Sequence, residues 1–385
     1  MTDNLNASNA ARALRWAREG RYGNAIRSLE SLGVASPSDD SAWTELLKRH
    51  PQQELPSFST DVPSTLTVDS QDVLSALRGF PKGTSPGGSG LRAQHLHDAI
   101  CGSTAPAASD CLHALTVWVN YLLSGKAHSW LSPWLAGAPL TALKKKGSGV
   151  QPIAVGEIFR RLVSRICCAI LRPRLSDFFI PCGQVGVGVQ GGLEAAIHAV
   201  RCFLQLHEDD PNLCLLKVDM RNAFNECSRT TFLQRVKSCF PELFGWTQWC
   251  YAFPAELRFG RKRIQSCVGV QQGDPLGPLL FSLVLADLLD QISIPGIMFS
   301  VWYLDDGTIV GSRSAILEFC LKLKLWGLLW AFFLTSKNVN CFGHPETNHF
   351  RTSPWSYVDL LMGLICWALQ FGDLIISLIP TLHPR

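Results

Sequence analysis

The sequence predicts an α+β fold in which an antiparallel sheet packs on helices. Short apolar runs at residues 213–219, 298–302 and 308–311 have the length and residue types of strands. Residues 157–171 show the apolar spacing of an amphipathic helix, which we expect to end before Pro173. A chain of 385 residues is long enough for two or three domains and a sizeable core.

The bulk composition is that of a globular chain. It is 47% hydrophobic and 17% charged, with a formal net charge of +4, so overall charge alone does not identify a nucleic-acid-binding protein. The basic residues are nevertheless clustered, which suits contacts with phosphate groups but is also typical of solvated loops. These clusters are Lys144–Lys146, Arg160–Arg161, Arg258 and Arg261–Arg263.

Fourteen cysteines are present without a Cys-x-x-Cys pair, as is typical of a reduced protein of the cytoplasm or nucleus. His95 and His97 with Cys101 make a poor zinc site, because a fourth ligand is missing. The polar stretch Met1–Ala11 does not have the apolar segment of a signal peptide. We therefore expect an intracellular protein. Nothing in the sequence indicates its oligomeric state.

Three acidic residues point to a specific chemistry. Asp305 and Asp306 follow Tyr303 between two β-rich runs, and taken alone they are equally typical of a hairpin turn. Asp219, however, closes the apolar run 213–219, which places a third carboxylate at the end of another strand. Three carboxylates on neighbouring strand ends are the ligands that two divalent metal ions need for phosphoryl transfer.

Three motifs in order carry a family resemblance. They are Asp219-x-x-x-Ala-Phe224, Gln272-Gly-x-Pro-x-Gly-Pro278 and Tyr303-x-Asp-Asp306. Together they resemble the palm motifs of reverse transcriptases, most closely those of retrotransposons without long terminal repeats, and the resemblance covers residues 75–345. It implies a right-hand polymerase with fingers and palm that copies an RNA template into DNA from a DNA primer and deoxynucleoside triphosphates.

The resemblance also implies a metal site. Asp219 and Asp305 would each bridge two Mg²⁺ ions, with Mn²⁺ as a possible substitute, and Asp306 would be an accessory acid. The backbone carbonyl of Met220 would supply a further oxygen ligand. Three close carboxylates without a cation would repel one another, so the cluster makes sense chiefly as a cation site.

Further residues are expected to bind the nucleotide's phosphates. Residues 140–146 and 150–155 read as a hairpin, and in the resembling enzymes such a hairpin reaches over the incoming nucleotide. Lys145 stands where the family has its phosphate-binding lysine. Gln151 replaces the family's arginine and lacks its charge, which puts nucleotide affinity in doubt. Lys337 lies in a segment resembling the loop whose lysine protonates pyrophosphate, although a solvated surface lysine is the competing interpretation.

The remaining nucleotide contacts concern the sugar. Phe224 corresponds to the aromatic residue that blocks a ribose 2′-hydroxyl, and it can also be part of the core. Residues 256–259 and 264–270 predict a hairpin that leads into Gln272 and Gly273. Gly273 permits close approach of the backbone to a nucleotide, and Gln272 would hydrogen-bond near its sugar or phosphates.

We expect four segments along the chain. They are an N-terminal helical segment and linker (1–63), a fingers-like region (64–212), a palm (213–345) and an apolar tail (346–385). The tail is too short for the family's thumb, which we expect to be absent or truncated. Val358–Ile379 is long enough to span a bilayer, but Asp359 and Asp373 argue against a membrane partner. A truncated or frame-shifted copy is the favoured explanation.

Three rival interpretations remain open. A decayed copy could retain the fold without activity, as Gln151 and the missing thumb suggest. A non-catalytic nucleic-acid-binding module could use the basic clusters alone. Gly186–Gly191 also matches the dinucleotide-binding pattern Gly-x-Gly-x-x-Gly. That pattern requires a preceding strand, and Phe178–Ile180 is too short, so a loop near the template is preferred over an oxidoreductase.

Overall fold

A computed structural model describes residues 2–53, 64–101, 105–146, 149–329 and 333–342. It mixes helices with two four-stranded sheets, so the α+β class is confirmed. The contacts divide the chain into two compact units, each assembled from two separate stretches of sequence. The first unit is Met1–Leu171 with Phe224–Val284, and the second is Arg172–Ala223 with Leu285–Arg385. The segment boundaries expected at residues 63, 212 and 345 stay predictions.

The first unit holds most of the helices and one sheet. Its helices are α1 (Thr2–Arg18), α2 (Tyr22–Leu29), α3 (Asp40–Lys48), α4 (Ser70–Arg78), α5 (Ala93–Cys101), α6 (Ala105–Leu123), η1 (Ser129–Leu131), α7 (Ser132–Leu135), α11 (Arg229–Cys239), η2 (Pro241–Leu243) and α12 (Phe244–Tyr251). Its strands are β1 (Ala138–Lys144), β2 (Val150–Ala154), β4 (Ala255–Phe259) and β5 (Lys262–Ser266). The helices α8 (Ile158–Phe179), α10 (Ala223–Glu226) and α13 (Gly277–Asp290) contribute residues to both units.

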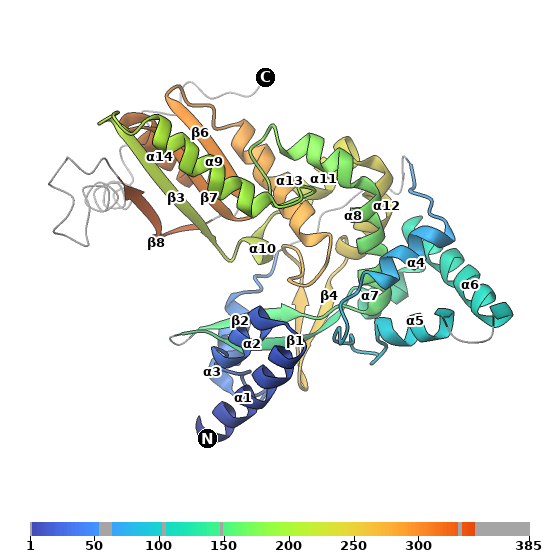
Figure 1. The fold of residues 1–385 in the computed structure, drawn as a ribbon. Helices are drawn as coiled ribbons and strands as arrows, with labels where there is room; N and C mark the ends of the chain where they lie inside the picture. Colours follow the sequence, from blue (N-terminus) through green and yellow to red (C-terminus); the bar gives the residue numbers. More distant parts are fainter. Residues whose placement is uncertain (1, 54–63, 102–104, 147–148, 330–332, 343–385) are drawn as a thin grey trace. The chain divides into compact units, whose positions relative to one another are not determined.

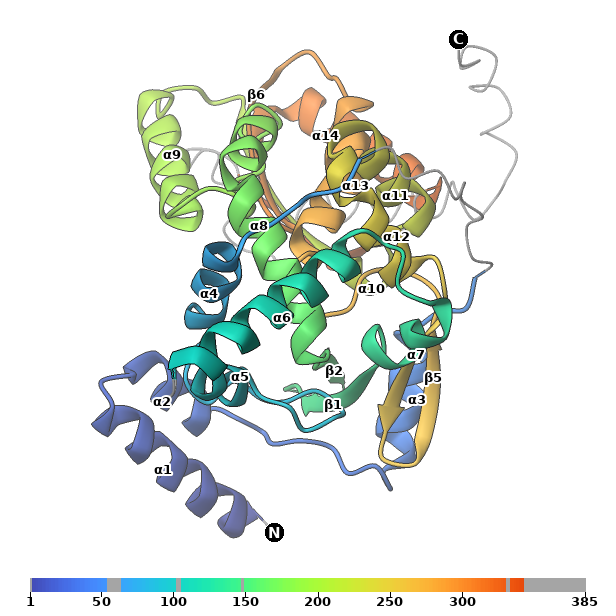
Figure 2. The same ribbon diagram turned by 90° about the vertical axis from the view of Figure 1, so that its right-hand side faces the viewer.

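Helices α4, α5 and α6 pack on one another, as Figure 2 shows. The start of α4 is fixed by a capping box, in which Asp69 accepts from the backbone of Gln71 and Asp72 while the Asp72 side chain accepts from the Asp69 amide. These bonds satisfy amides that the first turn of a helix leaves without partners. Asp69 is therefore the N-cap of α4.

The sheet of the first unit joins two predicted hairpins. Its strand order is β2-β1-β4-β5, and β1 runs parallel to β4, with Ala138 in register with Leu257. Helix α3 covers this sheet, where Leu46 is buried in the same apolar cluster as β1, β2, β4 and β5, and Trp43 stacks on Phe259. Periodicity predicts each hairpin but carries no information on their pairing. Strand β5 ends at Ser266, so the prediction that this strand reaches residue 270 was wrong.

Helix α8 does not end before Pro173, so that prediction was wrong. The helix continues through the proline to Phe179. Proline removes one backbone donor and costs helix stability, but packing can outweigh that cost. Leu171, Leu175 and Phe179 are all buried, which indicates that the C-terminal part of α8 is held by tertiary contacts.

The second unit is built on an antiparallel sheet with strand order β6-β7-β3-β8. Helix α14 packs against β7 and β3, and α9 lies along β6 (Figure 1). Lys337, which was expected to lie in a loop, belongs to strand β8. The elements of this unit are α9 (Gly192–Leu206), β3 (Leu213–Arg221), β6 (Ile297–Tyr303), β7 (Asp306–Ser312), α14 (Arg313–Leu329) and β8 (Phe333–Phe342).

The apolar tail Val358–Ile379 lies outside the described residues, so the expected absence of a membrane span there stays a prediction. Within the residues that the structure describes, no helix has the length and hydropathy needed to cross a bilayer.

Candidate active site

Two of the three predicted acids face each other across the sheet of the second unit. Asp219 on β3 is in register with Asp306, the first residue of β7, and both side chains are exposed. Residues directly opposite each other on antiparallel strands point to the same face, with Cβ atoms about 4.5–5.5 Å apart. The sequence predicted that Asp219 is the last residue of its strand. In the structure β3 continues to Arg221, so Asp219 lies two residues before the end of the strand.

Asp305 lies in the turn between β6 and β7. Tyr303 pairs with Asp306, which leaves Leu304 and Asp305 as a two-residue turn. Leu304 has a φ of 58° and Asp305 does not have a positive φ, a pattern of the type II′ hairpin turn, in which glycine is usual at the first position. The β6–β7 turn therefore brings Asp305 next to the cross-strand pair of Asp219 and Asp306.

The packing under this turn explains why glycine follows the two acids. The Trp302 side chain is fully buried, and a Cβ on Gly307 would lie 2.5 Å from its ring. Any side chain at position 307 would displace the indole that supports the β6–β7 hairpin. The Asp-Asp-Gly stretch therefore combines two exposed or half-buried acids with a residue that is required for packing.

The donor chemistry of these acids fits a hard divalent cation. Carboxylates at strand ends are short, anionic oxygen ligands of the type that Mg²⁺ prefers. Among the described residues, no group of three or more His, Cys, Asp or Glu side chains stands in an arrangement that could hold a metal ion. The backbone register brings the three acids together, while their side chains do not form a closed ligand cluster.

Two further predicted residues flank this sheet end. Met220 follows Asp219 on β3, and its side chain is buried, so the two side chains project to opposite faces. Lys337 belongs to β8, between Leu334, which pairs with Met220, and Val339, which pairs with Val218. The register between β3 and β8 shifts at this point, so Lys337 lies in an irregular part of the pairing. The roles of both residues stay predictions.

The first unit brings Gln272 and Gly273 against strand β2. The Ala154 amide donates to the Gln272 carbonyl at 3.0 Å. Gly273 has a φ of 128°, and a Cβ there would collide with the Ala154 carbonyl oxygen. Only glycine combines this backbone conformation with such a close approach. The glycine that the sequence assigned to a nucleotide contact is therefore also required by the packing of the loop on β2.

Phe224 belongs to the same part of the first unit. Its ring stacks on Phe281 of α13 with 5.0 Å between the ring centroids, and its carbonyl accepts from the Val270 amide at 2.7 Å. The side chain is half-buried. Both interpretations of Phe224, as a core residue and as a residue with an accessible edge, are compatible with this position.

Lys145 and Gln151 lie on the β1–β2 hairpin as predicted. The Lys145 amide donates to the Gly149 carbonyl at 3.0 Å, and its side chain is exposed. Gln151 is half-buried on β2, in register with Leu143. Thus the described hairpin places the basic residue in solvent and the glutamine on the body of the strand.

Comparisons with known proteins match part of the chain to a known family. The family model described as reverse transcriptase (RNA-dependent DNA polymerase) matches residues 143–331. The retrotransposable element SLACS 132 kDa protein of Trypanosoma brucei gambiense is 26% identical over 275 residues, which cover 69% of this chain. Residues 143–331 therefore match a reverse transcriptase domain. All the predicted site residues except Lys337 fall within the matched segment. The aligned region is 22% of the length of the SLACS protein.

The solved structures that resemble this chain have lower sequence identity to it than the SLACS protein. Telomerase from Candida albicans in complex with a TWJ fragment of telomeric RNA is 13% identical with a TM-score of 0.41, over 56% of this chain and 42% of that one. Apo telomerase from Candida tropicalis is 10% identical with a TM-score of 0.42, over 56% of this chain and 46% of that one.

A buried ionic network, which the sequence did not predict, holds the Gln272–Gly273 loop of the reverse transcriptase domain. Asp274 accepts from Arg160 at 2.7 Å and 3.0 Å, from the Tyr251 hydroxyl at 2.7 Å and from the Leu276 amide at 3.0 Å. Burial alone would lower the pKa of Arg160, but the interactions with Asp274, Tyr251 and Cys250 together more than offset this and the pKa is raised. For Tyr251, burial has the opposite effect because it disfavours the phenolate. Burial therefore raises the pKa of Tyr251, and the neighbouring Asp274 raises it further.

The same network corrects part of the expectation for the basic clusters. Arg160 is buried on Asp274, and the buried Arg161 donates to the Ser85 carbonyl at 2.6 Å, so neither is placed as a surface contact for phosphates. Lys262 donates to Asp40 at 2.7 Å, and Arg263 to Glu256 at 2.8 Å. Several residues of the basic clusters therefore pair with acidic residues of this protein.

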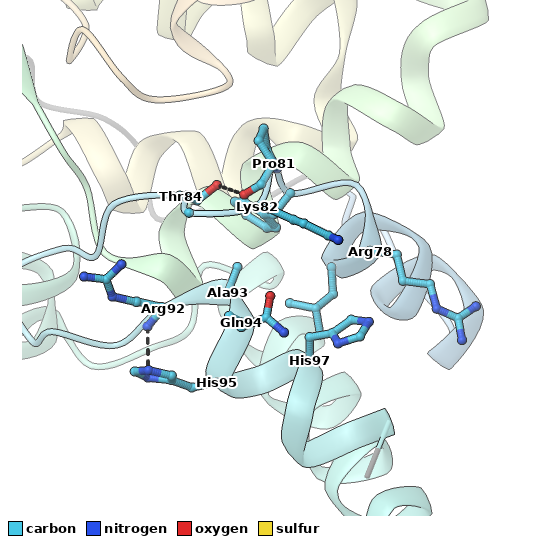
Figure 3. A pocket seen from close by; sticks show the side chains of 12 residues that line it. Arg78, Pro81, Lys82, Thr84, Arg92, Ala93, Gln94, His95 and His97 are labelled. Atoms are coloured by element: carbon cyan, nitrogen blue, oxygen red, sulfur yellow. Dashed lines mark hydrogen bonds between the residues drawn. The ribbon is translucent and has the colours of Figure 1, made fainter. Parts of the chain in front are cut away.

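A pocket in the first unit is lined by basic residues from α4, α5 and the loop between them (Figure 3). Its volume is about 510 Å³, and no acidic residue lines it. The positively charged or titratable lining residues are Arg78, Lys82, Arg92, His95 and His97. None of the residues predicted for catalysis or nucleotide binding belongs to this pocket.

The dinucleotide-binding interpretation of Gly186–Gly191 does not fit the structure. Helix α8 ends at Phe179, and between that residue and Gly186 the backbone forms only an isolated bridge between Gln184 and Trp302. The pattern therefore does not follow the strand that a dinucleotide-binding turn requires. The segment is a loop, as preferred from the sequence.

Proposed function

We propose that this chain performs RNA-templated DNA synthesis as part of a protein derived from a retrotransposon without long terminal repeats. The observation that carries the proposal is the register of Asp219 opposite Asp306, beside the turn that contains Asp305, within the segment that matches the reverse transcriptase family. In this proposal the sheet of β6, β7, β3 and β8 is the palm, and the β1–β2 hairpin belongs to the fingers.

Asp219, Asp305, Asp306 and the Met220 carbonyl would hold two Mg²⁺ ions, or Mn²⁺ in their place. When bound, such ions lower the pKa of the attacking 3′-hydroxyl and stabilise the charge of the leaving pyrophosphate. The short aspartate side chains supply rigid anionic ligands, and the cation in turn relieves their mutual repulsion.

The other residues would bind and orient the nucleotide. Lys145 and Gln151 would contact the triphosphate, and Gln272 would hydrogen-bond near the sugar or phosphates, beside the close backbone approach at Gly273. Phe224 would exclude a ribose 2′-hydroxyl. Lys337 would donate a proton to the leaving pyrophosphate. RNA template, DNA primer and deoxynucleoside triphosphates are the substrates of this proposal.

Primer extension tests the proposal. A DNA primer annealed to an RNA template is incubated with the chain, Mg²⁺ and deoxynucleoside triphosphates, and products are separated by length. We expect template-dependent extension that stops when a chelator removes Mg²⁺. No extension, with binding of the same duplex retained, would contradict the proposal.

The basic pocket between α4 and α5 favours a second candidate, a nucleic-acid-binding module without catalysis. A pocket with several cations and no acids suits phosphate groups. A decayed copy would behave in the same way, since Gln151 lacks the charge of the family's arginine. Both would bind duplex with an affinity that falls steeply as salt rises, and neither would extend a primer.

Replacing Phe224 with valine should relax sugar selection. The smaller side chain would leave room for a 2′-hydroxyl, and discrimination against ribonucleotides should fall by about tenfold or more. The measurement is kcat/KM for a ribonucleotide and for its deoxy form. Unchanged discrimination with deoxynucleotide activity retained would assign Phe224 to the core alone, where it stacks on Phe281.

Replacing Gln151 with arginine should improve nucleotide binding. A guanidinium can form two charge-assisted hydrogen bonds to a phosphate, which glutamine cannot. We expect KM for the nucleotide to fall by about tenfold, the equivalent of about 1.4 kcal/mol, with little change in kcat. Arginine at Thr141, which lies on the adjacent strand β1 and pairs with Ile153, is a control, and an equal effect there would indicate general electrostatic attraction.

A further inference from the structure

Gln184 contacts the β6–β7 turn through both ends of its side-chain amide. Its Oε1 accepts from the Leu304 amide at 2.9 Å, and its Nε2 donates to the Leu304 carbonyl at 3.1 Å. The same Oε1 accepts from the Gly186 amide at 2.9 Å. One side chain therefore satisfies both backbone groups of the residue that precedes Asp305.

The backbone beside Gln184 strengthens this attachment. The Trp302 amide donates to the Gly183 carbonyl at 2.7 Å, and the Val185 amide donates to the Trp302 carbonyl at 2.8 Å. A Cβ on Gly186 would lie 2.8 Å from the Leu304 nitrogen, so glycine permits the loop to approach the turn this closely. The loop 183–186 thus adds to the edge of β6 and reaches its turn.

The turn needs such support because its conformation is unfavourable for leucine. Leu304 has a φ of 58°, a conformation that is unfavourable for a residue other than glycine and persists only where the surroundings hold it. Gln184 is only 2% exposed, so water cannot readily replace its hydrogen bonds. The buried amide therefore specifies one turn conformation.

We propose that Gln184 is a positioning residue that fixes the Leu304–Asp305 turn and so sets the placement of the Asp305 carboxylate for cation binding. The inference rests on the proposed function, because it concerns the placement of Asp305 in the proposed cation site. Gln184 itself touches the backbone of Leu304 and acts through the turn. The sequence of this segment indicates only a loop.

The test compares Gln184→Met, which keeps the length of the side chain and removes its hydrogen bonds, with Gln190→Met. Gln190 lies in the same loop and is exposed, so it is the matched control. Three quantities are measured: the hydrogen-exchange rate of the Leu304 amide, the affinity for Mn²⁺ in the absence of primer and nucleotide, and the melting temperature. If Gln184→Met does not fold, Gln184→Asn replaces it, since the shorter amide stays polar but cannot span both groups of Leu304.

For Gln184→Met we expect faster exchange at Leu304, a small change in melting temperature and Mn²⁺ affinity reduced by about 10–100-fold, as is usual when a partner that orients metal ligands is removed. In extension assays kcat should fall and the Mg²⁺ requirement rise, with KM for the nucleotide nearly unchanged. Gln190→Met should alter none of these. Wild-type Mn²⁺ affinity in Gln184→Met would overturn the inference, whereas absence of Mn²⁺ binding in the wild-type chain would contradict the proposed function itself.

Discussion

Replacing Asp305 with asparagine should abolish primer extension on an RNA template, with a loss of at least about 1,000-fold in rate. A loss of this size corresponds to about 4 kcal/mol of transition-state stabilisation. Asparagine keeps the shape of the side chain but removes the negative charge with which it would bind a divalent cation. Asp305 is half-buried in the β6–β7 turn, so the substitution should leave the fold intact.

A matched control separates loss of charge from loss of a catalytic ligand. Asp290, at the end of α13, is exposed, and Asp290→Asn removes the same charge from the surface. We expect this variant to extend primers at the wild-type rate. Extension by Asp305→Asn at more than about a tenth of the wild-type rate would contradict the assignment of Asp305 as a metal ligand.

Replacing Asp274 with alanine should destabilise the chain by about 3–5 kcal/mol. Arg160 would then be left buried without the carboxylate to which it donates at 2.7 Å and 3.0 Å, and removal of one partner from a buried ion pair has a cost of this size. Tyr251 and the Leu276 amide would lose their acceptor as well. This loss is a large part of the roughly 5–15 kcal/mol that stabilises a typical protein.

The free energy of unfolding in urea measures this effect. Asp290→Ala removes an exposed acid from α13 and should change that free energy by no more than about 0.5 kcal/mol. A change below about 1 kcal/mol for Asp274→Ala would mean that the buried network does not stabilise the Gln272–Gly273 loop. Catalytic assays of this variant are informative only at temperatures where it is folded.

The order of the motifs allowed much of the acidic cluster to be predicted. Asp219 ends an apolar run and Asp305–Asp306 separates two others, so the short apolar runs place all three acids on strands or at their ends. The register of Asp219 with Asp306 depends on the pairing of β3 with β7, which the resemblance implied and local pattern cannot specify.

Other features depend on contacts between residues distant in sequence. Asp274 was not singled out, because a carboxylate after glycine is typical of a turn and its partner Arg160 lies far upstream. Gln184 gave no signal either, since its role arises from the close approach of its loop to Leu304. The continuation of α8 past Pro173 likewise follows from tertiary packing, which outweighs local propensity.

Cleavage of the backbone by bound iron tests most directly whether Asp219, Asp305 and Asp306 form one cation site. With hydrogen peroxide as oxidant and ascorbate as reductant, Fe²⁺ in place of Mg²⁺ generates hydroxyl radicals that cut the chain near the ion, and the fragments are identified by mass spectrometry. We expect cuts around residue 219 and around residues 305–306 in the same molecules, suppressed by excess Mg²⁺ and lost in Asp219→Asn. Cuts at only one of the two segments, or at neither, would contradict a shared site.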